Sequence, residues 1–229
     1  MKKKLTTLMT VCVVLIGGGL LPSVLQAQVR QSIDVQEWPT GKVVLVNGDT
    51  LYGTLTYYRT PDIVNVSHED GSMTSVSPVN VEYFVAQEMP SGKSYTFRTL
   101  FWDMGKPYSD FKKPTFFEVL NQGALTLIKR EAYSQGNANT ANATVYEPVT
   151  GSSPWASDHI RNLYYILLPN GEIVSLKNLR KDLQALFGNK YKDVKSYIKL
   201  NKLDYEKPHE LVAIVNYFNT LSGSTSLAY

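Results

Sequence analysis

The residues best suited to metal or acid–base chemistry in this sequence are its histidines, and they lie far apart. They are His68, His159 and His209. A zinc site without cysteine needs histidine and carboxylate ligands at short spacing, such as two histidines on one helical turn. His68-Glu69-Asp70 is dense in polar groups, but Gly71 follows it, and the run is typical of a solvated turn. We therefore expect neither a metal site nor a cofactor.

The sequence also lacks the recognisable motifs of other kinds of catalysis. The string G-x-S-x-G, which holds a serine nucleophile on a strained turn, does not occur, and neither does a P-loop or a dinucleotide-binding glycine motif. The paired carboxylates of a glycosidase meet only in space, and the nearest candidates are Asp103, Asp110 and Glu118. We predict that the protein is not an enzyme.

Aromatic side chains and lysines alternate in a loop rich in Pro and Gly, at residues 101–114. Aromatic rings stack on sugars, and lysines attract anionic groups, so the loop is a candidate binding site for a glycan or a lipid headgroup. Its candidate residues are Trp102, Lys106, Tyr108 and Phe111. The alternative is structural, with the aromatic residues capping an open end of a sheet.

Lysines also repeat at helical spacing beside an apolar face near the C-terminus. They are Lys192, Lys195, Lys199 and Lys202. Such a row would attract the phosphates of an inner leaflet or of lipopolysaccharide, giving a peripheral membrane contact. The alternative is that these lysines form the solvated face that any surface helix carries.

The first 27 residues have the layout of a secretory signal peptide. Lys2 to Lys4 form a positive start, residues 5–21 are largely apolar, and small Ala27 precedes Gln28. Cleavage is expected between Ala27 and Gln28, and a retained membrane anchor is the alternative. We expect an exported protein, either periplasmic or associated with the outer membrane.

Removal of the leader changes the charge and the cysteine content of the protein. Three lysines leave with it, so 20 basic residues remain against 20 acidic ones, and the overall charge no longer supports a nucleic-acid binder. Cys12, the only cysteine, leaves too, so the mature chain is expected to fold without a disulfide. No later apolar run is long enough for a transmembrane helix.

From residue 42 apolar and polar residues alternate between turn sequences, which is typical of antiparallel strands. The clearest turn is Asn47-Gly48-Asp49, because Asn-Gly tolerates the positive φ angles of a tight hairpin. Five hairpins are expected, with strands at residues 42–46 and 50–58, 62–67 and 72–76, 81–88 and 94–100, 115–120 and 124–129, and 163–168 and 172–176.

After residue 176 the apolar residues take helical spacing. One helix is expected at residues 179–187, where Gly188 is placed to end it. A second is expected at 191–198, and a third begins at Pro208. The predicted fold class is α+β, an antiparallel sheet system of about five hairpins, as a roll or two packed sheets, followed by three short C-terminal helices.

The chain is expected to divide into five regions around one long polar segment. Residues 134–159 are rich in Asn, Ala, Thr, Ser and Gly, which predicts a flexible insertion. The regions are a signal peptide at 1–27, an antiparallel β region at 28–133, the insertion at 134–159, a hairpin with helices on the same core at 160–222, and a tail at 223–229.

Two runs carry a family resemblance. Residues 41–53, Gly-Lys-Val-Val-Leu-Val-Asn-Gly-Asp-Thr-Leu-Tyr-Gly, and residues 164–187, with Leu-Pro-Asn-Gly before a Lys-rich helix, resemble an uncharacterised family of exported Bacteroidetes-type proteins. The resemblance spans roughly residues 41 to 221 and rests on turn and packing motifs. It implies export and a Gly-Asp-Thr hairpin with a helical C-terminus, and it implies no activity.

Together these observations favour an exported protein with a structural or interaction role in the periplasm or cell envelope, with an envelope protein or glycan as its partner. The alternative is a glycan- or headgroup-binding module that uses the loop at 101–114.

Overall fold

The structure is a computed structural model, and it describes residues 34–106, 110–134 and 159–223. All of these residues belong to one unit, Ser32–Tyr229. The predicted leader with its Ala27-Gln28 junction, Tyr108, residues 135–158 of the predicted insertion, and the tail from residue 224 lie outside the described residues.

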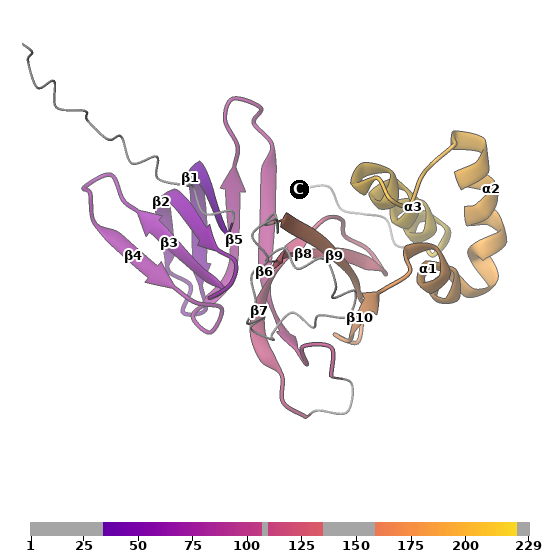
Figure 1. Cartoon of the computed structure of the whole chain (residues 1–229), viewed down its shortest axis with the longest axis horizontal. Coiled ribbons are helices and arrows are strands. Elements are labelled where there is room, and N and C mark those ends of the chain that lie inside the picture. Colours follow the sequence, from indigo (N-terminus) through magenta and orange to yellow (C-terminus); the bar gives the residue numbers. More distant parts are fainter. Residues whose placement is uncertain (1–33, 107–109, 135–158, 224–229) are drawn as a thin grey trace, which may run out of the picture. The chain divides into compact units, whose positions relative to one another are not determined.

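Within the described residues, ten strands form one antiparallel sheet, in the order β10-β9-β8-β7-β6-β5-β1-β2-β3-β4 (Figure 1). The strands are β1 (Val35–Leu45), β2 (Thr50–Tyr58), β3 (Ile63–Ser67), β4 (Met73–Val76), β5 (Val81–Gln87), β6 (Ser94–Trp102), β7 (Lys113–Val119), β8 (Thr126–Ser134), β9 (His159–Leu167) and β10 (Ile173–Leu176).

The predicted fold class is wrong. The strands make one curled ten-stranded sheet, not a roll or two packed sheets of five hairpins. The helices also differ from three short separate ones. Helix α1 (Leu179–Phe187), the 3-10 turn η1 (Gly188–Lys190) and α2 (Tyr191–Asn201) follow each other without a break, and α3 (Pro208–Leu221) comes after a connection.

The physical reason is that pairings between hairpins decide the architecture, and turn sequences do not specify them. Strand β1 pairs with β5, from Thr40 opposite Gln87 to Leu45 opposite Val81. Strand β8 pairs with β9 along its whole length, although the segment at residues 135–158 separates them in the chain. Together with the β2–β3 and β6–β7 pairings, they join all ten described strands into a single sheet.

The turn between β1 and β2 shows how local sequence fixes local structure. Gly48 has a φ of +90°, which a residue with a Cβ rarely adopts. The side chain of Asn47 accepts a hydrogen bond from the Asp49 N–H at 3.0 Å. The turn aligns the two strands, so that Val43 lies opposite Leu51.

Three apolar clusters form the core. The first lies on strands β1 to β7 and includes the stacked rings of Phe84 and Phe97, whose centroids are 4.4 Å apart. The second joins β8, β9 and β10 to the helices and includes Leu127, Ile166 and Phe187. The third, on the other face of β6 to β9, comprises Trp102, Phe117, Ile128 and Tyr165 with smaller contributions around them.

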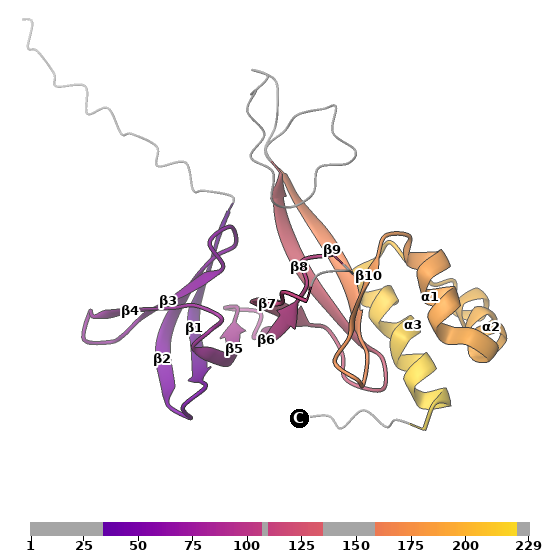
Figure 2. The ribbon, with the colours of Figure 1, turned by 90° about the horizontal axis from the view of Figure 1, so that it is seen from below.

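The helices pack on the β8–β10 end of the sheet (Figure 2). Asn219 in α3 is only 2% exposed, and its amide makes two hydrogen bonds of 2.9 Å with the backbone N–H and C=O of Leu125. Gly123 lies so close to Asn219 that a Cβ there would overlap its side chain. Asn216 of α3 also accepts a hydrogen bond from Asn121 at 2.8 Å, so two polar side chains help to set where α3 meets the sheet.

The sheet opens between β7 and β8. Their paired positions are Glu118 with Lys129 and Val119 with Ile128. Beyond this point β7 pairs with β6, and β8 pairs with β9. Residues 59–62, the connection from β2 to β3, contact both strands at the opening, and this is where most of the buried charge of the described chain lies.

Candidate functional site

The opening between β7 and β8 holds a network of charged side chains, which we call the charge network. Its members are Arg59, Asp62, Glu118, Lys129, Arg130 and Glu131. Strand β8 supplies three consecutive members, β7 supplies Glu118, and the β2–β3 connection supplies Arg59 and Asp62. Because buried charge is costly unless it is paired, the contacts of each member decide what the network can do.

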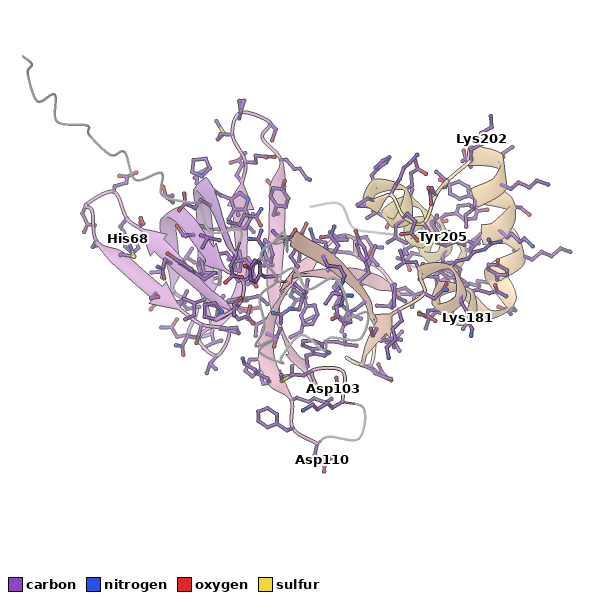
Figure 3. The ribbon with its side chains drawn as sticks, in the orientation of Figure 1. His68, Asp103, Asp110, Lys181, Lys202 and Tyr205 are labelled. Carbon is purple, nitrogen blue, oxygen red and sulfur yellow. The ribbon has the colours of Figure 1, made fainter. Side chains whose placement is uncertain are left out.

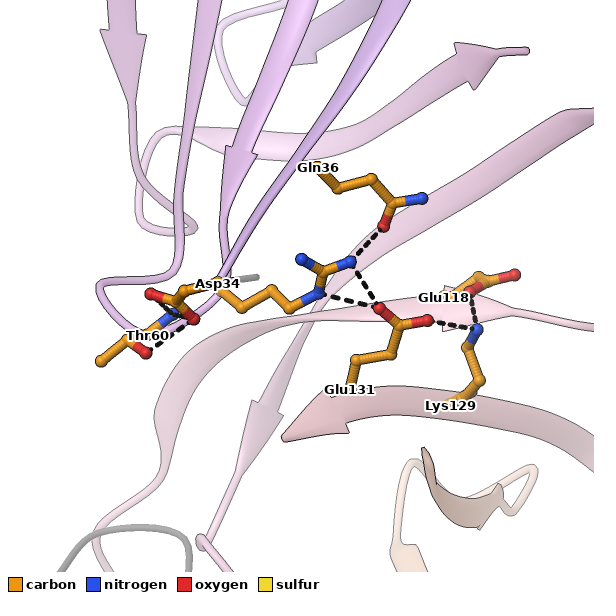
Figure 4. Close-up of polar contacts among 7 residues, drawn as sticks. Asp34, Gln36, Thr60, Glu118, Lys129 and Glu131 are labelled. Carbon is orange, nitrogen blue, oxygen red and sulfur yellow. Dashed lines mark hydrogen bonds and ion pairs between the residues drawn. The ribbon is translucent and has the colours of Figure 1, made fainter. Parts of the chain in front are cut away.

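Glu131 and Lys129 are the centre of the network (Figure 4). The Arg59 guanidinium donates to Glu131 Oε2 at 2.8 Å through Nε and also donates to Gln36 at 2.8 Å. The Lys129 ammonium lies 2.7 Å from Glu118 Oε2 and 3.0 Å from Glu131 Oε1. The chain of alternating charges therefore runs from Arg59 through Glu131 and Lys129 to Glu118.

Pairing outweighs burial in the ionisation of these two residues. Burial disfavours the ammonium of Lys129, but Glu118 and Glu131 more than offset it, so the pKa of Lys129 is raised. Burial also disfavours the carboxylate of Glu131, but Lys129 and Arg59 more than offset it, so its pKa is lowered. Both groups stay charged at neutral pH.

The Asp62 carboxylate gives β7 a hydrogen-bond acceptor where β8 no longer pairs with it. This carboxylate accepts the Tyr57 hydroxyl at 2.7 Å and the backbone N–H of Phe116 in β7 at 3.2 Å. Burial raises the pKa of Asp62, against the opposing effect of Arg130, whose Nη1 lies 3.7 Å from it. Asp62 itself has a φ of +58°, a conformation that this set of contacts holds in place.

Arg130 extends from β8 to the opposite face of the sheet. Its guanidinium lies 5.5 Å from the ring centroids of both Trp102 and Phe117. Nη1 is buried and has no hydrogen-bond partner among the described residues. A cavity of about 10 Å³ borders Arg130, Glu118 and Glu131, which is the space of about one water molecule. The charge network therefore joins the two sides of the opened sheet.

The candidate glycan loop is not assembled as a stacking surface in the described residues. Trp102 is 4% exposed, with its ring edge-on to Phe117 and Tyr165, so it presents no ring face to a sugar. Phe111 and Lys106 are exposed. Phe101, Trp102 and Phe111, the residues of the alternative capping role, do not act together, because Phe101 and Phe111 are exposed while Trp102 belongs to the third apolar cluster.

The three candidate glycosidase carboxylates do not share one environment. Asp103 accepts the N–H of Gly105 at 2.9 Å within the β6–β7 connection, where Asp110 also lies (Figure 3). Glu118 is inside the charge network and bound to Lys129. No paired acid and base results from these three residues.

His68 and His209 take part in local contacts, and the side chain of His159 lies outside the described part of the structure. His68 lies 3.1 Å from the Tyr52 carbonyl through Nδ1 and 2.9 Å from Thr74 Oγ1 through Nε2, which ties the β3–β4 turn to β2. His209 is exposed at the start of α3. Among the residues that the structure describes, no group of three or more His, Cys, Asp or Glu side chains could hold a metal ion.

The predicted lysine row lies on α2 and at its end. Lys192, Lys195 and Lys199 are exposed at spacings of three and four residues, which places them on one face of the helix. Lys202 is exposed in the left-handed conformation that ends α2 (Figure 3). None of the four forms an ion pair with another described residue.

Nearby Lys190 has a different role, which the sequence did not indicate. Its ammonium donates to the carbonyl of Leu221 at 2.7 Å and to Ser222 at 3.1 Å, at the C-terminal end of α3. A cation is favourable there because the last carbonyls of a helix carry partial negative charge. Lys190 therefore joins α3 to η1 and does not belong to the row.

Comparison of the chain with protein-family models, with curated proteins and with solved structures gave no match. The resemblance to exported Bacteroidetes-type proteins stays a prediction. In the part of the chain that the structure describes, no helix has both the length and the apolar character needed to cross a membrane.

Proposed function

We propose that this chain is an exported, non-enzymatic protein that binds an anionic surface of the cell envelope through the lysine row of α2. The observation that carries the proposal is the set of three exposed lysines on one helical face, without ion-pair partners among the described residues. The sequence features of the first 27 residues support export to the compartment where such a surface is found.

The composition around the row supports an anionic partner. Residues 177–202 contain eight basic residues and two acidic ones, while the chain beyond the predicted leader is balanced overall. The positive charge is thus concentrated in the helical part. Such a local excess steers an anionic surface to the helical side of the protein, because the remaining residues beyond the predicted leader contain more acidic than basic groups.

The helix that carries the lysines is held firmly in place. Val194 of α2 is fully buried, and the rings of Tyr197 and Tyr217 stack with centroids 4.0 Å apart, joining α2 to α3. The lysine row is therefore presented by a packed element, so little further ordering of the backbone is needed when a partner binds.

The expected strength of this contact is modest. Each lysine close to an anionic membrane contributes about 1 kcal/mol, so the three lysines of α2 contribute about 3 kcal/mol. That is less than the roughly 4 kcal/mol of a millimolar complex. The contact should weaken as salt is added, because the screening length falls to about 10 Å at 0.1 M.

Vesicle sedimentation tests the proposal. The protein is mixed with vesicles of phosphatidylcholine alone, or of phosphatidylcholine with phosphatidylglycerol, and the bound fraction is measured at low salt. We expect binding to the anionic vesicles only. The triple variant K192Q/K195Q/K199Q should lose about 100-fold in affinity, from about 1 kcal/mol for each lysine.

A matched control removes the same charge elsewhere. The variant K93Q/K106Q/K112Q changes three exposed lysines of the β5–β6 turn and the β6–β7 connection, and it should bind anionic vesicles almost as wild type does. If this control loses binding and the α2 variant keeps it, the contact lies near the loop at 101–114 and the proposal is wrong.

A further inference from the structure

A groove of about 310 Å³ lies among the helical elements, next to the lysine row. It is formed by α1, by α2 and by the connection from α2 to α3. Its lining residues are Arg180, Tyr191, Lys195, Ile198, Leu203, Asp204 and Tyr205. Lys195 belongs to both the groove and the lysine row, so a partner held on the row would reach the groove.

The groove is apolar inside and cationic at its rim. The side chains of Ile198, Leu203 and Tyr205 are half-buried, while Arg180 and Lys195 are exposed. Asp204 is the only acidic lining residue of this described groove, and its carboxylate accepts the N–H of Glu206 at 3.0 Å. The groove is thus lined by two cationic side chains and by one carboxylate, which already accepts a hydrogen bond within the connection.

The two tyrosines add hydrogen-bond donors. Burial raises the pKa of Tyr205, and neighbouring Tyr191 raises it further, with Arg180 acting in the opposite direction. The Tyr205 hydroxyl therefore stays protonated at neutral pH and can donate to an anion. Figure 3 shows Tyr205 among the helices, with Lys181 on α1.

We infer that this groove binds a phosphate ester joined to a short apolar chain, with the phosphate at Arg180 and Lys195 and the chain over Ile198 and Leu203. A planar guanidinium makes paired hydrogen bonds to phosphate oxygens, and an ammonium beside it adds charge. The volume is at the lower end for ligand pockets, which suits a headgroup with a few carbons and not a whole lipid.

This inference rests on the proposed function, because it assigns a specific site to the same anionic partner. The lysine row alone gives weak contact, as estimated above. A pocket for one headgroup would add affinity and selectivity. The phosphate ester has two possible sources, a lipid in a membrane or a free molecule, and the probes below separate them.

The test uses calorimetric titration with butyl phosphate, a soluble phosphate ester with one short apolar chain, and with inorganic phosphate as a second probe. We expect wild type to bind the ester more tightly than phosphate, since only the ester fills the apolar part. Arg180→Gln should weaken ester binding by at least about tenfold, the usual cost of losing a charged hydrogen bond.

Lys181→Gln is the matched control. Lys181 is exposed, neighbours Arg180 in α1 and does not line the groove, so its change removes the same charge outside the site. We expect ester binding within about twofold of wild type for this variant. Equal losses in both variants, or no ester binding by wild type, would overturn the inference.

Vesicle sedimentation of the same variants separates the two proposals. If wild type binds anionic vesicles through the lysine row but does not bind the soluble ester, the groove inference fails and the proposed function stands. If the ester binds at Arg180 but vesicles do not bind, the groove takes a free phosphate ester and the membrane function fails.

Discussion

At the scale of single residues, charged side chains can be withdrawn from water in this protein because each forms an ion pair with another. Lys129, Arg130 and Glu131 are consecutive in β8, a run that would suit an exposed strand. They are half-buried because Arg59 and Asp62 arrive from the β2–β3 connection, more than 60 residues earlier in the chain. The cost of breaking one such pair is the cost of leaving its partner uncompensated.

Glu131 gives a prediction at this scale. Its lowered pKa means that the carboxylate stabilises the fold above the pKa of the unfolded chain, which is about 4.3. This contribution is lost as the pH falls through the still lower folded pKa. Glu131→Gln should therefore reduce the free energy of unfolding by about 2 kcal/mol at neutral pH, below the value for a fully buried pair because Glu131 is partly exposed.

The measurement is urea unfolding of wild type and variant at neutral pH and at about pH 3. The difference between the two proteins should shrink in acid. Glu69→Gln, in an exposed turn, is the control and should show little difference at either pH. A difference for Glu131→Gln that stays constant or grows in acid would contradict the assignment of Glu131 to an ionised network.

At the scale of elements, what could be predicted from the sequence is local. The Asn47-Gly48-Asp49 turn lies between β1 and β2, because its residues carry their own conformational preference. The β1–β5 and β8–β9 pairings could not be predicted, because the local sequence does not specify which strand pairs on the side away from the hairpin partner. Nor did helical spacing show that η1 would carry α1 directly into α2.

The candidate site divides in the same way. Helical spacing placed Lys192, Lys195 and Lys199 on one face, because that face depends only on helix geometry. The burial of Trp102 depends on Phe117 and Tyr165, which reach it through sheet pairing that the sequence does not show. The groove beside Lys195 could not be predicted either, because it brings Arg180 of α1 together with residues 203–205, more than 20 residues later in the chain.

A prediction at this scale concerns how Asn219 attaches α3 to the sheet. Asn219→Ala removes both hydrogen bonds to Leu125, which leaves the buried N–H of Leu125 without a partner and its C=O with only the 3.4 Å hydrogen bond from Asn121. We expect a loss of about 3 kcal/mol in the free energy of unfolding. Thr220→Ala, one residue along and exposed, should cost no more than about 0.5 kcal/mol.

Chemical denaturation measures both variants, and hydrogen exchange at the Leu125 amide locates the effect. Faster exchange at Leu125 in Asn219→Ala, without a matching change in Thr220→Ala, is the expected result. If the two variants are equally stable, the Asn219 contacts do not fix α3 on the sheet.

At the scale of the whole molecule, the described chain combines a curled sheet, joined at its opening by the charge network, with helices that carry a local excess of positive charge. The buried charged side chains that hold the fold are paired with one another inside the protein. The lysine row on α2, in contrast, has no ion-pair partner among the described residues, and the proposed function assigns it an external one.

The most direct test of that assignment is fractionation of cells that express the chain with a C-terminal tag. We predict that the tagged protein is exported, sediments with the membranes at low salt and is released by a high-salt wash, while K192Q/K195Q/K199Q is soluble at low salt. Wild-type protein that stays in the cytoplasm, or that is soluble in the periplasm at low salt, would contradict the account.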